Sequence, residues 1–438
     1  MTAARSDRDI LALSGEAAAM AVCKGRLTPQ KIEAAQFRHI EEREPAVKAW
    51  ARLADPAQNM DRHHISGPLS GVSVGVKDIF DTADMVTAYG SPAFADRRPE
   101  TDAWIVDRLR RAGATILGKT HTTEFACFHP APTRNPLHPD VTPGGSSSGS
   151  AAAVADGMVP ISLGSQTAGS TIRPAAFCGV FGFKPTFGLI PLTGVMRLAQ
   201  SLDTLGLFAR HLGDIPLTLS AITGRSWTCR SFEEPPCRFV IYRGPHWNKA
   251  STETTALFDR LTEILPQHAP CRSVGEIIGD RRLTPAQEVV MAREVHENFK
   301  PVLETKPDQV SDPFRHLCRF GASVSESEYR KAHLCRNEGY LAFRETLKAG
   351  EVVITPAAPG VAPNRADGTG DPVFNRMWTL LGVPCLSVPI KRPDRLPLAI
   401  QILGQRGEDE AVLQAGDWLS RTLPGILETA IPPIGPQF

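Results

Sequence analysis

Two short runs of small, polar residues carry the groups in this sequence that are best suited to covalent chemistry. Residues 144–150 read GGSSSGS, and residues 164–174 read GSQTAGSTIRP. Each run is a turn before a predicted helix, and small side chains let backbone N–H groups approach a ligand closely. A cluster of N–H groups of this kind stabilises the oxyanion of an acyl-transfer reaction. Flexible linkers have the same composition, so the two runs alone leave a linker or a plain turn open.

Lys77 adds a basic group to this set. It directly follows a predicted strand at residues 69–76, in which apolar residues alternate with serine and glycine. At such a strand end a lysine faces a cleft. The alternative interpretation is a surface charge paired with the neighbouring Asp78, and taken alone Lys77 is better explained in that way.

The three features together resemble the amidase signature family. That family has a lysine at the end of a strand, a run of the Gly-Gly-Ser-Ser-Gly-Gly-Ser type, and a Gly-Gly-Ser turn that holds the nucleophile. A Pro-Ala-Ala-Phe-Cys-Gly stretch and a Lys-Pro-Thr stretch follow that turn. The matching parts of this chain are Lys77, residues 144–150, residues 168–170, residues 174–179 and residues 184–186. The resemblance runs from about residue 11 to residue 423 and is strongest between residues 69 and 206.

The resemblance implies a Ser-Ser-Lys catalytic triad. Ser170 is then the nucleophile, Ser146 the bridging serine in a cis peptide, and Lys77 the base. The oxyanion hole is then made by the backbone N–H groups of Thr167, Ala168, Gly169 and Ser170. A serine hydroxyl is a weak nucleophile until a base takes its proton. A lysine, whose pKa in water is about 10.4, serves as that base only where burial lowers its pKa.

Two positions near the nucleophile depart from the family pattern. Gln166 stands where the family commonly has Asp, which leaves the support of the turn open. Ala168 replaces a frequent glycine, and its methyl group adds strain if this position requires φ > 0. Neither change removes a residue of the triad, so we expect an active enzyme.

Other nucleophiles and a metal fit the sequence less well. Residues 145–149 match the G-x-S-x-G pattern with Ser147 as its serine, but that motif needs a strand directly before it, and residues 139–143 are not one. Cys178 lies in an apolar run, which is typical of a buried, unreactive thiol. The histidines fit no common ligand spacing, so we expect neither a metal nor another cofactor.

Four residues are candidates for contact with the substrate. Arg173 either supports the nucleophile turn or meets a carboxylate of the substrate, and the supporting role is preferred. The acyl pocket is predicted to include Phe125, Phe128 and Trp378. Aromatic residues are also common in plain cores.

Strands and helices alternate along the chain as in a layered α/β protein. Strands are predicted at residues 69–76, 114–117, 159–163, 179–183, 352–355, 385–388 and 398–403. Helices are predicted at residues 10–23, 29–43, 150–155, 285–299, 326–346 and 409–419, and between Thr101 as its cap and Gly113 as its end. We expect a mixed, largely parallel central sheet covered by helices, which is the amidase signature fold. We expect one domain over residues 1–438, with a catalytic core at about 65–210 and 350–425 and a variable helical region at about 211–349.

Composition limits the classes of function. The 438 residues carry 48 Lys and Arg against 47 Asp and Glu, so no basic excess indicates a nucleic-acid partner. The nine cysteines are scattered and odd in number, which argues against a disulfide framework. The sequence has neither a signal core nor an apolar stretch of about 20 residues, the length that a membrane span requires. We expect a cytoplasmic protein that binds neither nucleic acid nor membrane.

The sequence therefore predicts an enzyme that hydrolyses a carbon–nitrogen bond of a small-molecule carboxamide, urea or carbamate through an acyl-serine. One alternative is the amidase subunit of a tRNA-dependent amidotransferase, which requires partner subunits. Another is a non-catalytic binding protein on the same fold, against which the complete triad argues. The only partner expected for the main hypothesis is the small amide itself, and a homodimer is one option for the assembly.

Overall fold

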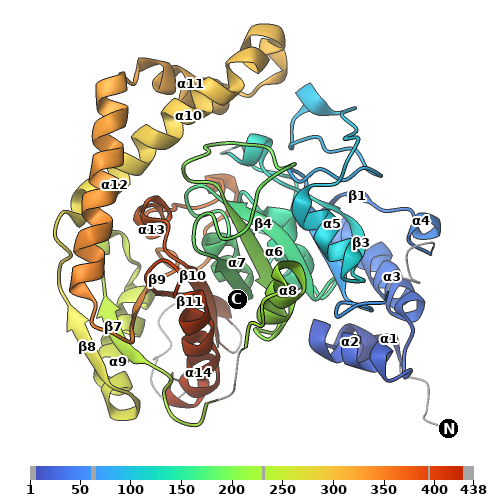
Figure 1. The fold of residues 1–438 in the computed structure, drawn as a ribbon, viewed down its shortest axis with the longest axis horizontal. Coiled ribbons are helices and arrows are strands. Elements are labelled where there is room, and N and C mark those ends of the chain that lie inside the picture. The colour runs from blue at the N-terminus through green and yellow to red at the C-terminus, as the bar shows by residue number, and fades with distance from the viewer. Residues whose placement is uncertain (1–5, 61–65, 128, 229–231, 393–394, 428–438) are drawn as a thin grey trace.

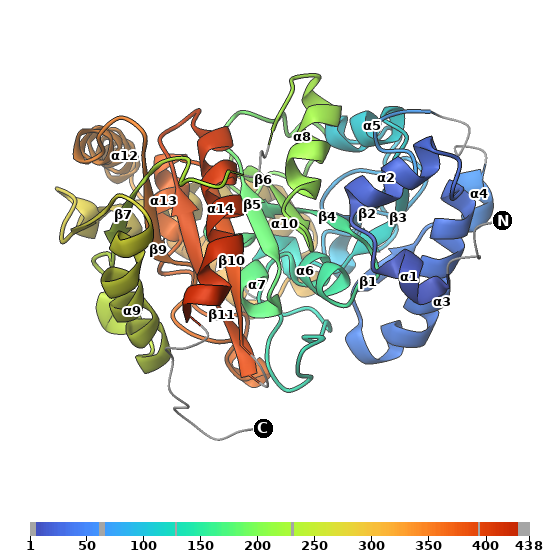
Figure 2. The same ribbon diagram turned by 90° about the horizontal axis from the view of Figure 1, so that it is seen from below.

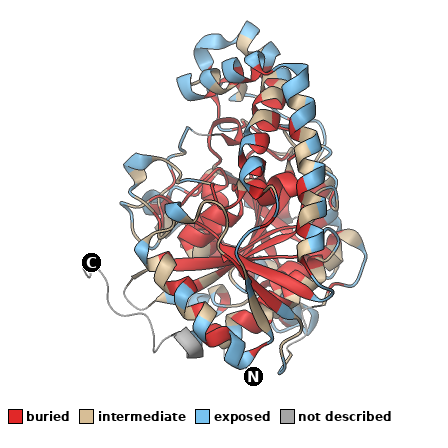
Figure 3. Ribbon diagram, turned by 90° about the vertical axis from the view of Figure 1, so that its left-hand side faces the viewer, coloured by how far each residue is buried: buried red, intermediate tan, exposed pale blue. Residues whose placement is uncertain are grey.

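An eleven-stranded sheet spans the residues that the structure describes. The structure is a computed structural model, and it describes residues 6–60, 66–127, 129–228, 232–392 and 395–427. Helices lie on both faces of the sheet, and the strands between them are buried (Figures 1 and 3). In sheet order the strands are β1 (Trp50–Leu53), β3 (Thr115–Thr120), β2 (Ser73–Lys77), β4 (Ile161–Gln166), β6 (Thr204–Ala209), β5 (Phe181–Lys184), β10 (Cys385–Arg392), β11 (Arg395–Leu403), β9 (Glu351–Pro356), β7 (Arg238–Tyr242) and β8 (Cys271–Val274).

The sheet is mixed, as the sequence predicts. Strand β2 runs parallel to β3 and to β4, and β7 runs parallel to β9 and to β8. The pairs β1–β3, β4–β6, β5–β6, β5–β10, β10–β11 and β9–β11 are antiparallel. Every residue of β2, β3, β4 and β6 is buried, which is the expected environment for strands covered on both faces.

The parallel strands β2 and β4 decide where functional groups gather. Val76 of β2 is paired with Leu163 of β4, so the two strands end at the same edge of the sheet. The predicted crossover is confirmed, because the helix α5 (Trp104–Arg111) connects β2 to its parallel neighbour β3. Polar residues at the carboxyl ends of β2 and β4 are thereby brought side by side.

Helices from both halves of the chain cover the sheet. The helices of the first half are α1 (Asp7–Leu11), α2 (Gly15–Cys23), α3 (Pro29–Val47), α4 (Pro56–Met60), α6 (Ser148–Ala155) and α7 (Ile172–Cys178). Those of the second half are α8 (Asp214–Thr223), α9 (Thr252–His268), α10 (Leu283–Thr305), α11 (Asp312–Ser323), α12 (Glu326–Thr346), α13 (Arg376–Leu381) and α14 (Asp409–Leu427). In both Figure 1 and Figure 2, α1 to α3 lie at one end of the sheet and α9 and α12 at the other.

The helices α10, α11 and α12 form an extension beyond the sheet. Helix α10 packs on α11, on α12 and on α13 (Figure 1). The outer faces of the extension are exposed in Figure 3, whereas the strands below are buried. Residues 211–349, expected to be a helical region, also contribute β7 and β8 to the central sheet.

Several local predictions were wrong. The predicted helix at residues 10–23 is two helices, because the Ser14 side chain caps α2 by accepting a hydrogen bond from the N–H of Ala17. The cap of α5 is Ala103, without a side-chain hydrogen bond, and not Thr101. The sequence pattern did not predict β1, β6, β7 or β8. The predicted bounds of α12 are confirmed, and its Ser325 forms a capping box with Glu328.

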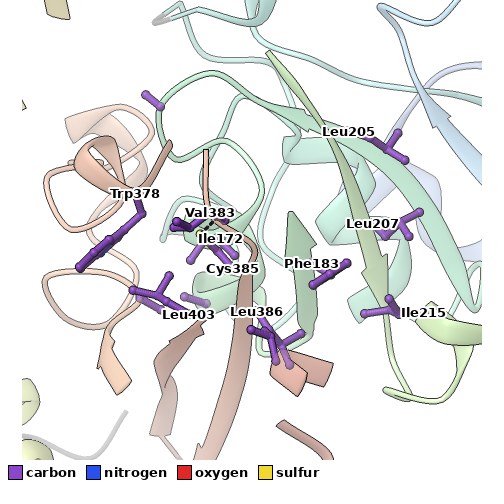
Figure 4. Close-up of a cluster of buried hydrophobic side chains, with 14 of the residues drawn as sticks. Ile172, Phe183, Leu205, Leu207, Ile215, Trp378, Val383, Cys385, Leu386 and Leu403 are labelled. Atoms are coloured by element: carbon purple, nitrogen blue, oxygen red, sulfur yellow. Dashed lines mark hydrogen bonds between the residues drawn. The ribbon is translucent and has the colours of Figure 1, made fainter. Parts of the chain in front are cut away.

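The hydrophobic core lies between the middle strands and the helices on them. Figure 4 shows Phe183 of β5, Leu205 and Leu207 of β6 and Leu386 of β10 in this cluster, together with Ile172 of α7. All five side chains are fully or almost fully buried. The core therefore fixes the strand ends and the start of α7, on which the candidate site is built.

Candidate active site

Lys77, the last residue of β2, is buried among hydroxyl groups. Its side chain has no exposed surface, and its Nζ donates to Ser146 Oγ at 2.7 Å and to Ser165 Oγ at 2.8 Å. No carboxylate pairs with it within the described residues. Burial lowers the pKa of Lys77 from 10.5 to about 7, and the nearby charge of Asp203 opposes part of that fall. The amine is thus poised to accept a proton near neutral pH, and the alternative of a surface charge paired with Asp78 is wrong.

Ser146 lies in the turn that precedes α6. The Gly145–Ser146 peptide bond is cis, as the resemblance implied. The helix that follows begins with small residues and packs closely on the neighbouring chain. A Cβ at Gly149 would lie 2.2 Å from the carbonyl oxygen of Ala49, so only glycine fits there. The packing of α6 therefore fixes the position of the Ser146 hydroxyl beside Lys77.

Ser170 lies at the start of α7 and shares a small cavity with Ser146. Ser170 retains 8% of its surface, and both serines line the cavity. The backbone N–H groups of residues 167–170 have no hydrogen-bond partner in the part of the chain that the structure describes. Free N–H groups beside a hydroxyl are the arrangement that an oxyanion requires.

Gln166 supports the turn that holds Ser170, a point that the change from the family's Asp had left open. Its Oε1 accepts from the N–H groups of Thr171 and Ile172, each at 3.0 Å, and its Nε2 donates to Thr379 Oγ1 at 3.0 Å. Thr379 Oγ1 in turn donates to the carbonyl of Ala168 at 2.6 Å. The amide therefore provides the acceptor that a carboxylate would provide, and it adds a donor.

Ala168 carries no backbone strain. The described non-glycine residues with positive φ are Lys48, Tyr89, Phe125 and Ala126, so Ala168 has an ordinary φ. Its methyl group is accommodated at the cavity wall. The strain that a positive φ would bring at this position is therefore absent.

Two residues to which the sequence analysis gave no role complete the surroundings of Lys77. Ser165, in β4, accepts the second hydrogen bond of the amine. Asp203 is buried, accepts a hydrogen bond from Thr167 Oγ1 at 2.5 Å and from the N–H groups of Leu198 and Ala199, and its pKa is raised by burial to about 6. Ser165 stands in the polar run of residues 164–174, and Asp203 stands in residues 201–206, which also match the family pattern. Neither signal showed that the two residues meet Lys77, because both lie far from it along the chain.

The other serine and cysteine candidates are unsuited to attack a substrate. Ser147 is fully buried, and its Oγ donates to the carbonyl of Ser165 at 3.3 Å. Cys178 is also buried, its Sγ donates to the carbonyl of Pro143, and burial raises its thiol pKa. The nucleophile-elbow alternative therefore has no support here.

The predicted aromatic pocket needs correction. Phe125 is fully buried, with its ring centroid 4.9 Å from that of Phe299 and 4.8 Å from that of Phe314. Trp378 packs edge-on against Tyr242 and Phe343 and lies in the core shown in Figure 4. Neither lines the cavity, because their large apolar rings are used in core packing. Phe128 lies outside the described residues.

The cavity is walled instead by small, apolar and cationic residues. Besides Ser146 and Ser170 it is lined by Ala126, Cys127, Thr167, Ala168, Arg173, Met291, Thr369, Pro372 and Arg376. The cavity volume is about 30 Å³. A single water needs on the order of 10–15 Å³, so an acyl group that enters the cavity must be short.

Two features are absent from the described residues, a metal site and a membrane-spanning helix. No group of three or more His, Cys, Asp or Glu side chains is arranged to hold a metal ion. No described helix combines the length and the apolar character needed to cross a membrane.

Comparison with known proteins identifies the family. The Amidase family model matches residues 32–251. A glutamyl-tRNA(Gln) amidotransferase subunit of Thermus thermophilus is 31% identical over a match that covers 90% of this chain and 94% of that protein. The chain belongs to the amidase family. It is an enzyme that acts on carbon–nitrogen bonds other than peptide bonds.

Solved structures of amidases share the fold over nearly the whole chain. A crystal structure of an amidase is 29% identical with a TM-score of 0.84, and the match covers 93% of this chain and 99% of that one. The corresponding glutamyl-tRNA(Gln) amidotransferase subunit from Thermotoga maritima is 24% identical with a TM-score of 0.80, covering 97% of this chain and 98% of that one. This second likeness concerns the fold alone.

Proposed function

We propose that this amidase hydrolyses a small carboxamide through an acyl-enzyme on Ser170. The observation that carries the proposal is the buried Lys77 amine, 2.7 Å from Ser146 Oγ, in a site where Ser146 and Ser170 line one cavity. A lysine with a pKa of about 7 is half neutral near pH 7 and accepts a proton. A charged lysine at its ordinary pKa does not.

The first half of the reaction forms an ester. Ser170 Oγ attacks the carbonyl carbon of the amide and gives its proton to Ser146, while Ser146 passes its own proton to Lys77. The carbonyl oxygen becomes an oxyanion beside the free N–H groups of residues 167–170. When the carbon–nitrogen bond breaks, the leaving nitrogen takes the proton from Lys77 by way of Ser146. The products are an acyl-serine and an amine or ammonia.

The second half repeats the proton path with water. Water gives a proton to the Ser146–Lys77 pair as its oxygen attacks the ester carbon, and Ser170 recovers a proton when the acid leaves. The turn stays in place through both halves because Gln166 and Thr379 hold its backbone. Preorganised donors of this kind are worth about 3 to 4 kcal/mol each in transition-state stabilisation.

The amidase subunit of a tRNA-dependent amidotransferase is the second candidate. The names of the relatives support it more directly than they support a free-standing amidase, because several of them are glutamyl-tRNA(Gln) amidotransferase subunits at 25–31% identity. Both candidates use the same cleavage of an amide by Ser170. They differ in whether the released ammonia enters water or is passed to a partner subunit. The non-catalytic alternative has the least support, because the triad is complete and its lysine is buried.

Mutation of the triad tests the proposed chemistry. We expect Ser170→Ala and Lys77→Ala each to lower kcat/KM on a panel of amides, ureas and carbamates by at least about a thousandfold. Ser147→Ala is the matched control. Ser147 is the direct neighbour of Ser146 in the sequence, but its hydroxyl donates to the backbone carbonyl of Ser165. Full activity in either triad variant, or a fluorophosphonate adduct on Ser147 in place of Ser170, contradicts the mechanism.

A second experiment separates the two candidates. Gel filtration of protein purified from its native cell, followed by a glutaminase assay, reports whether partner subunits are bound and whether glutamine is hydrolysed. A free-standing amidase is active alone, and its homodimer, if formed, appears as a single species. We propose a cytoplasmic location and a single domain over residues 1–438, on the basis of the composition and of the order of the elements along the chain.

A further inference from the structure

Arg173 is a buried cation without a negative partner. It lies in α7, three residues after the nucleophile, and keeps 5% of its surface. Its Nε donates to the carbonyl of Thr369 at 2.9 Å, and its Nη2 donates to the carbonyl of Gly145 at 2.8 Å and to Thr369 Oγ1 at 3.4 Å. Its Nη1 is buried and has no hydrogen-bond partner among the described residues. Leaving a buried charged donor unsatisfied is costly, so a missing acceptor is indicated.

Arg376 brings a second cation to the same cavity. It is the first residue of α13, and its Nη1 donates to Gln287 Oε1 at 2.6 Å. Its nearest acid in the described chain is Glu288, at 3.6 Å from Nε and about half exposed. An exposed acid at that distance offsets little of the charge. Both guanidinium groups therefore act on the cavity that Ser170 shares.

The cavity lining offers these two cations no carboxylate. The residues that line the cavity include no Asp or Glu. The charge of Asp371 raises the pKa of both arginines, but Asp371 does not line the cavity. Burial, and then the charge of Arg376, lower the pKa of Arg173 to about 9, so its guanidinium stays protonated at neutral pH. The remaining walls are small or apolar, with Ala126, Met291 and Pro372 among them.

We infer that this cavity is an anion subsite, and that the substrate is a small amide whose acyl chain carries a carboxylate bound by Arg173 and Arg376. The inference rests on the proposed function. The unpartnered Nη1 of Arg173 can donate to a carboxylate oxygen, and a charge-assisted bond of this kind is stronger than one to a neutral acceptor. The small volume limits the spacer between the amide carbonyl and the carboxylate to a few carbon atoms. The pairing also orients the amide carbonyl toward Ser170.

The two possible roles of Arg173 predict different data. If it only supports the turn through Gly145, its loss lowers the hydrolysis of every amide by the same factor. If Arg173 binds the substrate, its loss lowers kcat/KM mainly for amides that carry a carboxylate. The ratio of kcat/KM for a half-amide of a short dicarboxylic acid to kcat/KM for the methyl ester of that half-amide measures the difference directly.

The test compares these ratios in the wild type and in single variants. We expect the wild type to prefer the half-amide at least tenfold, and Arg376→Gln and Arg173→Met to lose that preference. Arg173→Lys should keep part of it, because the charge is retained. Arg210→Gln is the matched control, since Arg210 also donates to backbone carbonyls but bonds Leu11 and Leu13, far from the cavity. A wild type without preference, or variants at Arg173 and Arg376 with an unchanged ratio, overturns the inference.

Binding to an inactive variant separates this inference from the proposed function. Succinate and glutarate should raise the melting temperature of Ser170→Ala, and Arg376→Gln in the same background should remove that effect. If amides are hydrolysed by Ser170 but neither preference nor binding is found, the anion subsite is wrong and the proposed function stands. If Ser170 takes no part in hydrolysis while the dicarboxylates still bind, the proposed function fails and the cation pair remains an anion site. Glutamine in the same panel reports on the amidotransferase candidate.

Discussion

The pH dependence of the reaction is the most direct measure of Lys77. The pKa of this lysine falls from 10.5 to about 7 because the side chain is completely buried. At 1.36 kcal/mol per pKa unit the difference is worth about 5 kcal/mol against the charged form. At pH 7 about half of the molecules then hold the neutral base, whereas an ordinary lysine would be neutral in only about one molecule in three thousand.

The assay is kcat/KM for one neutral amide from about pH 5 to pH 9, with the rate of fluorophosphonate labelling as a second readout. The neutral form of Lys77 is present above its folded pKa, so activity is lost as the pH falls. We expect an acid limb with a midpoint near 7 and about a tenfold fall for each pH unit below 6. A rate that is level across this range, or a midpoint near 10, refutes the reasoning.

Asp203→Asn is the control that assigns the limb. The charge of Asp203 raises the pKa of Lys77, so its removal should move the midpoint to lower pH. Asp203 itself has a pKa of about 6, raised by burial, and therefore titrates in the same window. If the limb vanished in this variant, Asp203 would be the titrating group and Lys77 would not. The amide keeps an oxygen for the hydroxyl of Thr167, but its NH2 group cannot accept from the N–H groups of Leu198 and Ala199. A melting curve of the variant therefore accompanies the assay.

Three further predictions concern stability and the nucleophile turn. Lys77→Met should be inactive but more stable than the wild type at pH 7 by on the order of 1 to 3 kcal/mol, measured as a higher denaturation midpoint. The reason is that burial lowers the pKa of Lys77 in the folded protein and so disfavours its protonated form. That gain should shrink as the pH rises from about 7 toward 10, since the unfolded lysine then also becomes neutral; an unchanged gain would contradict it. Gly169→Ala should lower kcat at least tenfold, because the new Cβ would lie 2.5 Å from Asn375 Oδ1 and push the turn away, and wild-type kcat would exclude this effect. Gln166→Leu should cost about 1 to 3 kcal/mol in unfolding free energy and lower labelling of Ser170, since it removes the acceptor at the start of α7; equal stability to the wild type would show that this acceptor is dispensable.

The spacing of the reactive residues was predictable because it is local. Gly144 to Ser147 and Ala168 to Ser170 form turns before helices, and a small residue is required where the backbone passes another chain segment closely, as at Gly149 in α6. The helical pattern of residues 326–346 predicted the bounds of α12 that the structure shows. The spacing of apolar residues predicted one helix over residues 10–23, but the cap at Ser14 divides this segment into α1 and α2.

Only the tertiary structure decided which residues surround the reactive groups. Asp203 directly precedes β6 and Arg376 begins α13, both far along the chain from Lys77, and no spacing rule joins them to Lys77 or Ser170. The same limit explains the aromatic residues, because Phe125 and Trp378 are equally suited by type to a pocket or to a core. The sequence by itself determined the residues capable of the chemistry. Folding determined that Lys77 is buried, that the cavity is small, and that the cavity is lined by two cations. Burial and charge depend on residues that come into contact only when the strands and helices pack together.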